Sequence, residues 1–266
     1  MAPAARLAAM RKFWVPALLL LLAAAAAAQA PAYTYQRSGA AGDRAGAPRP
    51  GFLLMGGGTD VDAGFQWMCQ RAGGGDFLVL RASGTDAYDP YILKLCPALH
   101  SAATLIIPSR AAAQDPFVAR RIAEASAIFI SGGDQSNYVN FWSGTPVQQQ
   151  LNAAIRRGVP LGGTSAGLAV LGEFVYSAQN DHPRDPNLTS AAALANPFHP
   201  QVVVARNFLN LPELRGLITD THFHNRDRLG RLLVFMARIL QAGDAAGTVG
   251  IGIDQHTALL VDGQGQ

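Results

Sequence analysis

Short apolar runs that alternate with helix-like segments are the feature that most constrains how this chain of 266 residues can fold. The apolar runs lie at 52–55, 77–80, 104–107, 127–130 and 159–161. The helix-like segments between them lie at 63–71, 91–99, 117–125 and 147–157. Continuous apolar strands connected by helices predict a mostly parallel sheet with helices on both faces, because such strands are buried on both sides. We therefore expect a three-layer α/β fold.

The pattern loosens in the last third of the chain. Residues 176–200 are polar and rich in Pro and Asn, which predicts a long loop or hairpin. Later elements are expected at 201–204 and 216–219 as strands, at 228–241 as a helix, and at 249–253 and 258–261 as a closing pair of strands. The sequence ends soon after the last of these elements, so a truncation at the C-terminus is an alternative that we keep.

The N-terminal residues have the composition of a secretory signal. Arg6, Arg11 and Lys12 precede an apolar run from Trp14 to Ala28 that ends in small residues. These 15 residues are fewer than the roughly 20 that a membrane-spanning helix needs, so we favour a cleaved signal over a retained anchor. We expect residues 1–28 to be removed and the protein to be secreted or periplasmic.

The rest of the chain divides into a leader and a domain. Residues 29–50 are rich in Ala, Gly, Pro and Arg without apolar periodicity, so we predict a flexible leader followed by one catalytic domain over 51–266. The whole chain carries 21 basic and 18 acidic residues, but three of the basic residues and none of the acidic ones belong to the signal. The remaining 18 of each sign leave no net charge, which disfavours a general binder of nucleic acid or of membrane surfaces.

Two cysteines, Cys69 and Cys96, admit two interpretations. Export would allow a disulfide between them, whereas each lies in a helix-like apolar pattern in which a free buried cysteine is also common. No cluster of Cys and His has the spacing of a zinc site, so no metal is predicted. The sequence does not determine the oligomeric state, and a homodimer is one of the alternatives.

A serine between glycines is the first candidate for chemistry. Residues 163–167, Gly-Thr-Ser-Ala-Gly, fit the G-x-S-x-G motif and directly follow an apolar run. In this motif the serine sits on a sharp turn between a strand and a helix, and the free N–H groups at the helix start point toward its oxygen. The N–H of Ala166 can then face a developing oxyanion. The alternative is a structural turn in which Ser165 only caps the next helix.

A serine nucleophile needs a base to take its proton. Of the six histidines, His222 follows the strand expected at 216–219, so it should lie at the ligand-binding edge of the sheet. His224 lies two residues further and would face elsewhere on an extended chain. His222 is therefore the first candidate for the base, and spacing alone leaves the assignment open.

Four blocks occur in one order along the chain, at 129–135, 163–167, 220–232 and 250–254. Together they resemble the cyanophycinase branch of the S51 serine peptidases. The resemblance implies a flavodoxin-like core, similar to that of class I glutamine amidotransferases, and hydrolysis without a metal or an organic cofactor. It also implies an aspartyl or arginyl peptide as substrate: cyanophycinases split a polymer with an aspartate backbone and arginine side groups, and related members cleave aspartyl dipeptides.

The resemblance also assigns roles to individual residues. Ser165 matches the nucleophile, His222 matches the general base, and the backbone of Gly133 matches a second oxyanion donor beside Ala166. The positions that match substrate-binding residues are Asp134, Gln135, Asp220, Arg226, Arg228 and Arg231. At helical spacing the three arginines do not share one face, so we expect at most one or two of them to point into the site.

One position departs from the family pattern. A glutamate follows Gly-Ile-Asp in cyanophycinases, whereas this chain has Gln255, whose neutral amide can accept the ring N–H but cannot stabilise an imidazolium. Asp254 or Asp181 could orient His222 instead. The hypotheses are a secreted serine-type exopeptidase with Ser165, His222 and Gln255 as catalytic residues, which we favour, and a catalytically impaired peptide-binding protein. A glutamine amidotransferase would need a cysteine in place of the serine.

Overall fold

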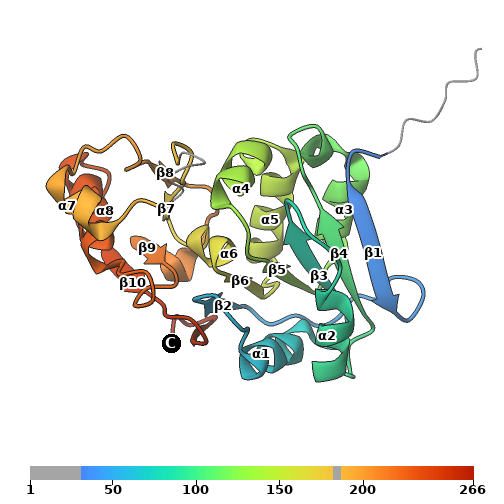
Figure 1. Cartoon of the computed structure of the whole chain (residues 1–266). Coiled ribbons are helices and arrows are strands. Elements are labelled where there is room, and N and C mark those ends of the chain that lie inside the picture. The colour runs from blue at the N-terminus through green and yellow to red at the C-terminus, as the bar shows by residue number, and fades with distance from the viewer. Residues whose placement is uncertain (1–30, 182–186) are drawn as a thin grey trace, which may run out of the picture. The chain divides into compact units, whose positions relative to one another are not determined.

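The computed structural model describes residues 31–181 and 187–266 (Figure 1). The signal predicted over 1–28 therefore lies outside the described residues. Within them the chain forms a large sheet of seven strands and a small sheet of four. In the order in which they pair, the strands of the large sheet are β1 (Thr34–Gly39), β4 (Ser101–Ile106), β3 (Asp76–Arg81), β5 (Ala127–Ile130), β6 (Leu161–Thr164), β2 (Gly51–Met55) and β11 (Ala258–Asp262). The five inner strands are parallel, and β1 and β11 are antiparallel edge strands.

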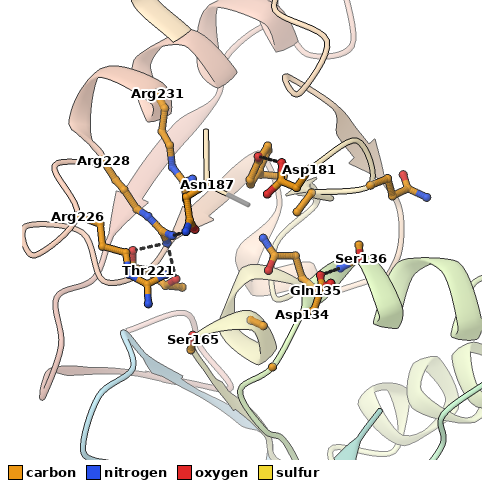
Figure 2. A pocket seen from close by; sticks show the side chains of 15 residues that line it. Asp134, Gln135, Ser136, Ser165, Asp181, Asn187, Thr221, Arg226, Arg228 and Arg231 are labelled. Atoms are coloured by element: carbon orange, nitrogen blue, oxygen red, sulfur yellow. Dashed lines mark hydrogen bonds between the residues drawn. The ribbon is translucent and has the colours of Figure 1, made fainter. Parts of the chain in front are cut away.

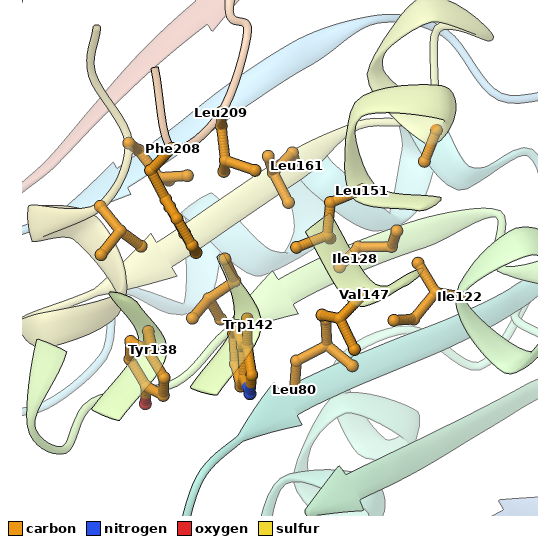
Figure 3. Close-up of a cluster of buried hydrophobic side chains, with 14 of the residues drawn as sticks. Leu80, Ile122, Ile128, Tyr138, Trp142, Val147, Leu151, Leu161, Phe208 and Leu209 are labelled. Atoms are coloured by element: carbon orange, nitrogen blue, oxygen red, sulfur yellow. The ribbon is translucent and has the colours of Figure 1, made fainter. Parts of the chain in front are cut away.

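Successive residues of a strand point to opposite faces of the sheet, so the buried strands carry apolar side chains on both faces. Helices cover each of these faces. The helices on one face are α1 (Asp62–Ala72) and α2 (Tyr88–Leu95), and those on the other are α3 (Pro116–Glu124), α4 (Gln135–Trp142) and α5 (Pro146–Arg156). On the first face, Phe65 of α1 packs against Phe129 of β5, with ring centroids 4.7 Å apart. On the second face, Leu80 and Ile128 lie beside Trp142 and Leu151 (Figure 3). The predicted α/β class, with a mostly parallel sheet between helix layers, is confirmed.

The small sheet follows the nucleophile turn along the chain and was not predicted as a separate sheet. Its strands, in pairing order, are β10 (Val249–Gly252), β9 (Leu217–Asp220), β7 (Phe174–Tyr176) and β8 (Val204–Arg206). The helices α7 (Ser190–Ala195) and α8 (Leu229–Gln241) pack against each other and against this sheet, burying Phe174, Ile218 and Phe235. The remaining helices are α6 (Ala166–Ala169) and the one-turn 3₁₀ helices η1 (Ala112–Gln114) and η2 (Pro212–Leu214).

The leader that was expected to be flexible over 29–50 contains a strand. β1 pairs with β4 from Thr34 opposite Ile106 to Gly39 opposite Ser101. The ring of Tyr33 stacks on that of Phe117, with centroids 5.0 Å apart. These aromatic contacts give the segment a partly buried face that its Ala-, Gly- and Pro-rich composition concealed, so residues 34–39 form an edge strand within the segment expected to be a flexible leader.

The strands predicted as a closing pair do not pair with each other. β10 pairs with β9 in the small sheet, whereas β11 pairs with β2 in the large sheet. Their connection therefore passes from one sheet to the other and carries Gln255. The strand expected at 201–204 begins only at Val204. Helix α4 was not predicted; the carboxylate of Asp134 caps it by accepting from the Ser136 N–H at 2.8 Å.

Two further features bear on the predictions from sequence. Cys69 of α1 and Cys96, directly after α2, form a disulfide that links these two helices, which settles the alternative left open by their spacing. In the described part of the chain no helix is both long enough and apolar enough to cross a bilayer.

Candidate active site

Three glycine-rich turns meet at one edge of the large sheet. The turns follow β2, β5 and β6, which are neighbours in the sheet and run parallel to one another. The carboxyl ends of parallel strands form the ligand-binding edge of an open α/β sheet. This edge therefore holds residues 56–58, residues 132–135 and the nucleophile turn together.

Ser165 sits on a sharp turn between β6 and α6. Its backbone has φ 52° and ψ −118°, a left-handed conformation that is strained for a residue with a side chain. Its N–H donates to the Met55 carbonyl at 3.1 Å, which ties the turn to β2. Gly167 lies so close to β5 that a Cβ there would come within 1.9 Å of the Ile130 carbonyl oxygen. The turn predicted from the G-x-S-x-G motif is therefore present, and close backbone contact requires a glycine after the serine.

His222 reaches Ser165 from the small sheet. It follows β9, has φ 45°, and its backbone N–H donates to the Gly56 carbonyl at 2.8 Å. A Cβ on Gly57 would lie 2.4 Å from Cε1 of the imidazole, so the glycine turn after β2 forms a surface against which the ring packs. Nε2 of His222 lies 2.7 Å from Oγ of Ser165, which is within reach for proton transfer. His224 is exposed and does not take this position.

The other ring nitrogen of His222 contacts Gln255. The side-chain Nε2 of Gln255 lies 2.6 Å from Nδ1 of His222. Neither alternative carboxylate takes this place: Asp181 accepts from the Tyr176 hydroxyl at 2.7 Å, and Asp254 accepts from the His224 N–H. An amide that donates to Nδ1 leaves the ring proton on Nε2, whereas a base needs the proton on Nδ1. A half-turn of the Gln255 amide places its carbonyl oxygen at Nδ1 and gives the tautomer that can deprotonate Ser165.

The surroundings keep the His222 ring neutral. Burial, followed by the nearby guanidinium groups of Arg226 and Arg228, lowers the pKa of His222 from its usual value to about 4. Asp220 acts in the opposite direction but does not offset these effects. An imidazole with this pKa is unprotonated at neutral pH and is available as a base.

Two backbone N–H groups are free to bind an oxyanion. Gly133 and Ala166 line the same pocket as Ser165, and neither N–H donates a hydrogen bond to another described residue. Ala166 is the first residue of α6, where the N–H groups have no partner within the helix. Developing negative charge on a carbonyl oxygen beside Ser165 is stabilised by such donors.

The three arginines lie on one wall of the pocket, contrary to the expectation that helical spacing would separate them (Figure 2). Helix α8 begins only at Leu229, and Asp227 has φ 46°, so Arg226 and Arg228 precede the helix and its periodicity does not apply to them. Arg226 is exposed, whereas Arg228 is 6% exposed and Arg231 is 1% exposed. All three guanidinium groups therefore border the same space.

Asp220, which was predicted to contact substrate, supports this wall and is not among the residues that line the pocket. Its carboxylate accepts from Nε of Arg231 at 2.7 Å and from Nη1 of Arg228 at 3.3 Å. It is 3% exposed. The Arg228 guanidinium also donates to the Thr221 carbonyl at 2.8 Å and to the Asn187 side chain at 3.3 Å.

The pocket has a volume of about 450 Å³, and its lining includes Ser165 as well as the three arginines. Asp134 and Gln135, at the start of α4, line it, and their contact with substrate stays a prediction. Sequence reasoning missed Tyr176, Asn187 and Thr221; the first two belong to a polar stretch without periodicity, although Thr221 stands directly before His222. No group of three or more His, Cys, Asp or Glu within the described ranges could hold a metal ion.

Comparisons with known proteins show the family of this chain. The model of peptidase family S51 matches residues 52–266. Cyanophycinases of Synechococcus elongatus and Thermosynechococcus vestitus are each 30% identical over 223 residues, which cover 80% of this chain and 63% of each cyanophycinase. The chain thus spans less than two thirds of the length of these curated relatives.

Solved structures show the same fold at low identity. A peptidase from an acI-B1 actinobacterium has a TM-score of 0.54 at 17% identity, covering 81% of this chain and 84% of that chain. A putative peptidase E protein from Listeria monocytogenes has a TM-score of 0.51 at 16% identity, covering 81% of this chain and 95% of that chain. Because the family model covers most of the chain and the described fold accords with it, the protein belongs to peptidase family S51.

Proposed function

We propose that this protein is a serine-type exopeptidase that hydrolyses aspartyl peptide bonds through an acyl-enzyme. The observation that carries the proposal is the 2.7 Å contact between Oγ of Ser165 and Nε2 of His222, at a pocket that also contains two free N–H groups. The similarity to cyanophycinases supports a substrate with aspartyl and arginyl groups, such as a cyanophycin-like β-Asp-Arg peptide or an aspartyl dipeptide. The signal predicted over 1–28 supports a secreted or periplasmic site of action.

The geometry supports a standard acyl-transfer sequence. Nε2 of His222 accepts the Ser165 proton while Oγ forms a bond to the scissile carbonyl carbon, and the carbonyl oxygen becomes an oxyanion held by the N–H groups of Gly133 and Ala166. His222 then returns the proton to the leaving amine as the carbon–nitrogen bond breaks. Water, deprotonated by the same imidazole, attacks the acyl-enzyme and releases Ser165 and a carboxylate product.

The arginine wall supports a carboxylate-bearing substrate. Planar guanidinium groups bind carboxylates with two parallel hydrogen bonds, and Arg226 is exposed enough to do so directly. Arg228 and Arg231 are held by Asp220, which fixes their planes before substrate arrives. A peptide with a free carboxylate on the acyl side of the scissile bond would place its carbonyl carbon near Ser165.

A covalent label tests the nucleophile directly. A fluorophosphonate, which phosphonylates activated serines, should form a bond from phosphorus to Oγ of Ser165 in the purified protein and release one equivalent of fluoride. Peptide mapping by mass spectrometry gives the position. The Ser165→Ala variant should not react, whereas Ser83→Ala, which removes an exposed serine outside the pocket, should react normally. Modification at another residue, or no modification of the folded protein, would refute the proposed mechanism.

One observation favours a second candidate, a peptide-binding protein with impaired turnover. The amide nitrogen of Gln255, and not its oxygen, lies at Nδ1 of His222, and this orientation stabilises the tautomer that cannot act as a base. Tight binding of β-Asp-Arg without hydrolysis, in both the wild type and Gln255→Glu, would select this function over the enzyme.

A further inference from the structure

The two walls of the pocket carry opposite charges. Arg226, Arg228 and Arg231 lie on one wall, and the carboxylate of Asp181, in the loop after β7, lies across the pocket from them (Figure 2). Among the described residues, Asp181 forms no ion pair with any of these arginines. Asp220 beneath them pairs with both buried arginines, so one carboxylate faces three guanidinium groups and the wall keeps a net positive charge. No described ion pair joins Asp181 to this wall, and its carboxylate is therefore available to a group bound in the pocket.

Asp181 is held in a defined orientation. Its Oδ1 accepts from the Tyr176 hydroxyl at 2.7 Å and from the Gln201 side chain at 3.3 Å, and no described residue donates to Oδ2. The Tyr176 ring is 2% exposed and stacks on Phe235, with centroids 4.6 Å apart. The turn before Asp181 is strained: Ala178 has φ 53° and its carbonyl accepts from the Asp181 N–H at 3.1 Å. Strained backbone of this kind often accompanies functional groups.

The environment of this carboxylate suits a positively charged partner. Partial burial raises the pKa of Asp181, while the Tyr176 hydroxyl and the charge of Arg231 act to lower it. A half-buried carboxylate with one oxygen that accepts from no described residue loses solvation that a bound cation can replace. A substrate cation at Oδ2 would gain a charge-assisted hydrogen bond in a site from which water is partly excluded.

We propose that Asp181 binds the cationic group of a zwitterionic substrate whose carboxylate is held by the opposite arginine wall. The inference deepens the proposed function and rests on it, because it assumes that the pocket holds the substrate. The cation is either the α-ammonium of an aspartyl residue or the guanidinium of an arginine residue. Both share the same chemistry, and the choice of peptides distinguishes them.

The test uses Asp181→Asn, because asparagine keeps an oxygen for Tyr176 and Gln201 but removes the charge. The substrates are β-Asp-Arg and β-Asp-citrulline, each with a free or an acetylated amino group. We expect Asp181→Asn to lower kcat/KM about 10- to 100-fold on peptides that carry the relevant cation and to leave the neutral analogues unchanged. An effect that disappears on acetylation identifies the ammonium, and one that disappears with citrulline identifies the guanidinium.

Further variants separate binding from folding. Tyr176→Phe, which removes one hydrogen bond to Asp181, should lower kcat/KM on the peptides that carry the relevant cation by a smaller factor than Asp181→Asn does. Asp244→Asn, which removes an exposed carboxylate outside the pocket, should change nothing. If Asp181→Asn slows all four peptides equally, or none of them, the proposal is wrong.

Binding measurements keep the inference separate from the proposed function. Calorimetric titration of Ser165→Ala with the same four peptides gives dissociation constants that do not depend on turnover. A preference for the cationic peptide that is lost in Ser165→Ala/Asp181→Asn supports the role of Asp181 even if the wild type hydrolyses none of the peptides. No such preference would overturn the role of Asp181 even if hydrolysis occurs.

Discussion

The large sheet positions its part of the site by apolar packing, whereas the small sheet positions its part by buried ionic contacts. Ser165 stands on the turn between the buried strand β6 and helix α6, and its neighbours are fixed by close backbone approach. Arg228 and Arg231 are fixed by Asp220, at the end of β9. Packing is non-directional and tolerates small changes, but a buried charge without its partner is strongly destabilising. The two halves should therefore respond differently to substitution.

The largest expected effect comes from Asp220→Asn. The substitution leaves two buried guanidinium groups without a carboxylate, which should lower the free energy of unfolding by about 3–5 kcal/mol and kcat/KM by about 100-fold. Urea unfolding and steady-state kinetics on the folded protein measure the two effects.

The matched control for Asp220→Asn is Leu80→Ala in the large sheet. Leu80 is fully buried, so its truncation should cost a comparable amount, about 2–5 kcal/mol. Its side chain packs against α4 and α5 and does not line the pocket, so kcat/KM of the folded fraction should stay near that of the wild type. Equal losses of kcat/KM in Asp220→Asn and Leu80→Ala would show that the two sheets do not differ in how they position the site.

A smaller effect is expected at the connection between the sheets, where Gln255 contacts His222. In Gln255→Glu a carboxylate accepts the Nδ1 proton and stabilises the imidazolium, so kcat/KM at neutral pH should rise about 10- to 100-fold. The wild-type kcat/KM should fall as pH decreases through about 4, because His222 becomes protonated and cannot accept the Ser165 proton. The new carboxylate raises the pKa of His222, so the fall of kcat/KM on the acidic side of the pH profile should move to higher pH.

The pH profiles of wild type and Gln255→Glu on one peptide check both parts of this prediction. Gln264→Glu adds the same charge at an exposed position outside the pocket and should leave the profile unchanged. If the kcat/KM of Gln255→Glu has the wild-type value at neutral pH and falls at the same acidic pH, the contact with residue 255 does not influence His222 as a base.

The smallest effect on catalysis is expected from the disulfide. Cys69 and Cys96 lie 27 positions apart in sequence, and their disulfide links two helices on one face of the large sheet. Replacing both with alanine should lower the free energy of unfolding by about 2–4 kcal/mol and leave kcat/KM unchanged. Thermal unfolding with and without reductant, together with kinetics, measures this. A clear fall in kcat/KM would show that the large sheet does not position Ser165 independently of α1 and α2.

Features that depend on local sequence could be predicted, and those that depend on distant contacts could not. The nucleophile turn at Ser165 and the strands before it follow from short-range patterns, and both were found. The strand at 34–39 was missed because its residues have no apolar periodicity, and only its pairing with β4 and its packing on Phe117 make it a strand. The shared wall of arginines was missed because Asp227 interrupts the helix, and single-residue backbone changes of this kind leave no periodic signal.

The sequence by itself determined the α/β class, the serine on its turn, and the identity of the residues that could serve as base and cations. Only the tertiary structure decided that His222 crosses from the small sheet to within 2.7 Å of Ser165, and that Gln255 takes the place of the expected carboxylate. It also decided that Asp220 supports the arginines and that Asp181 faces them. The physical reason is that turns and periodicity are set by neighbouring residues, whereas the distance between two side chains on different sheets is set by the packing of the whole chain.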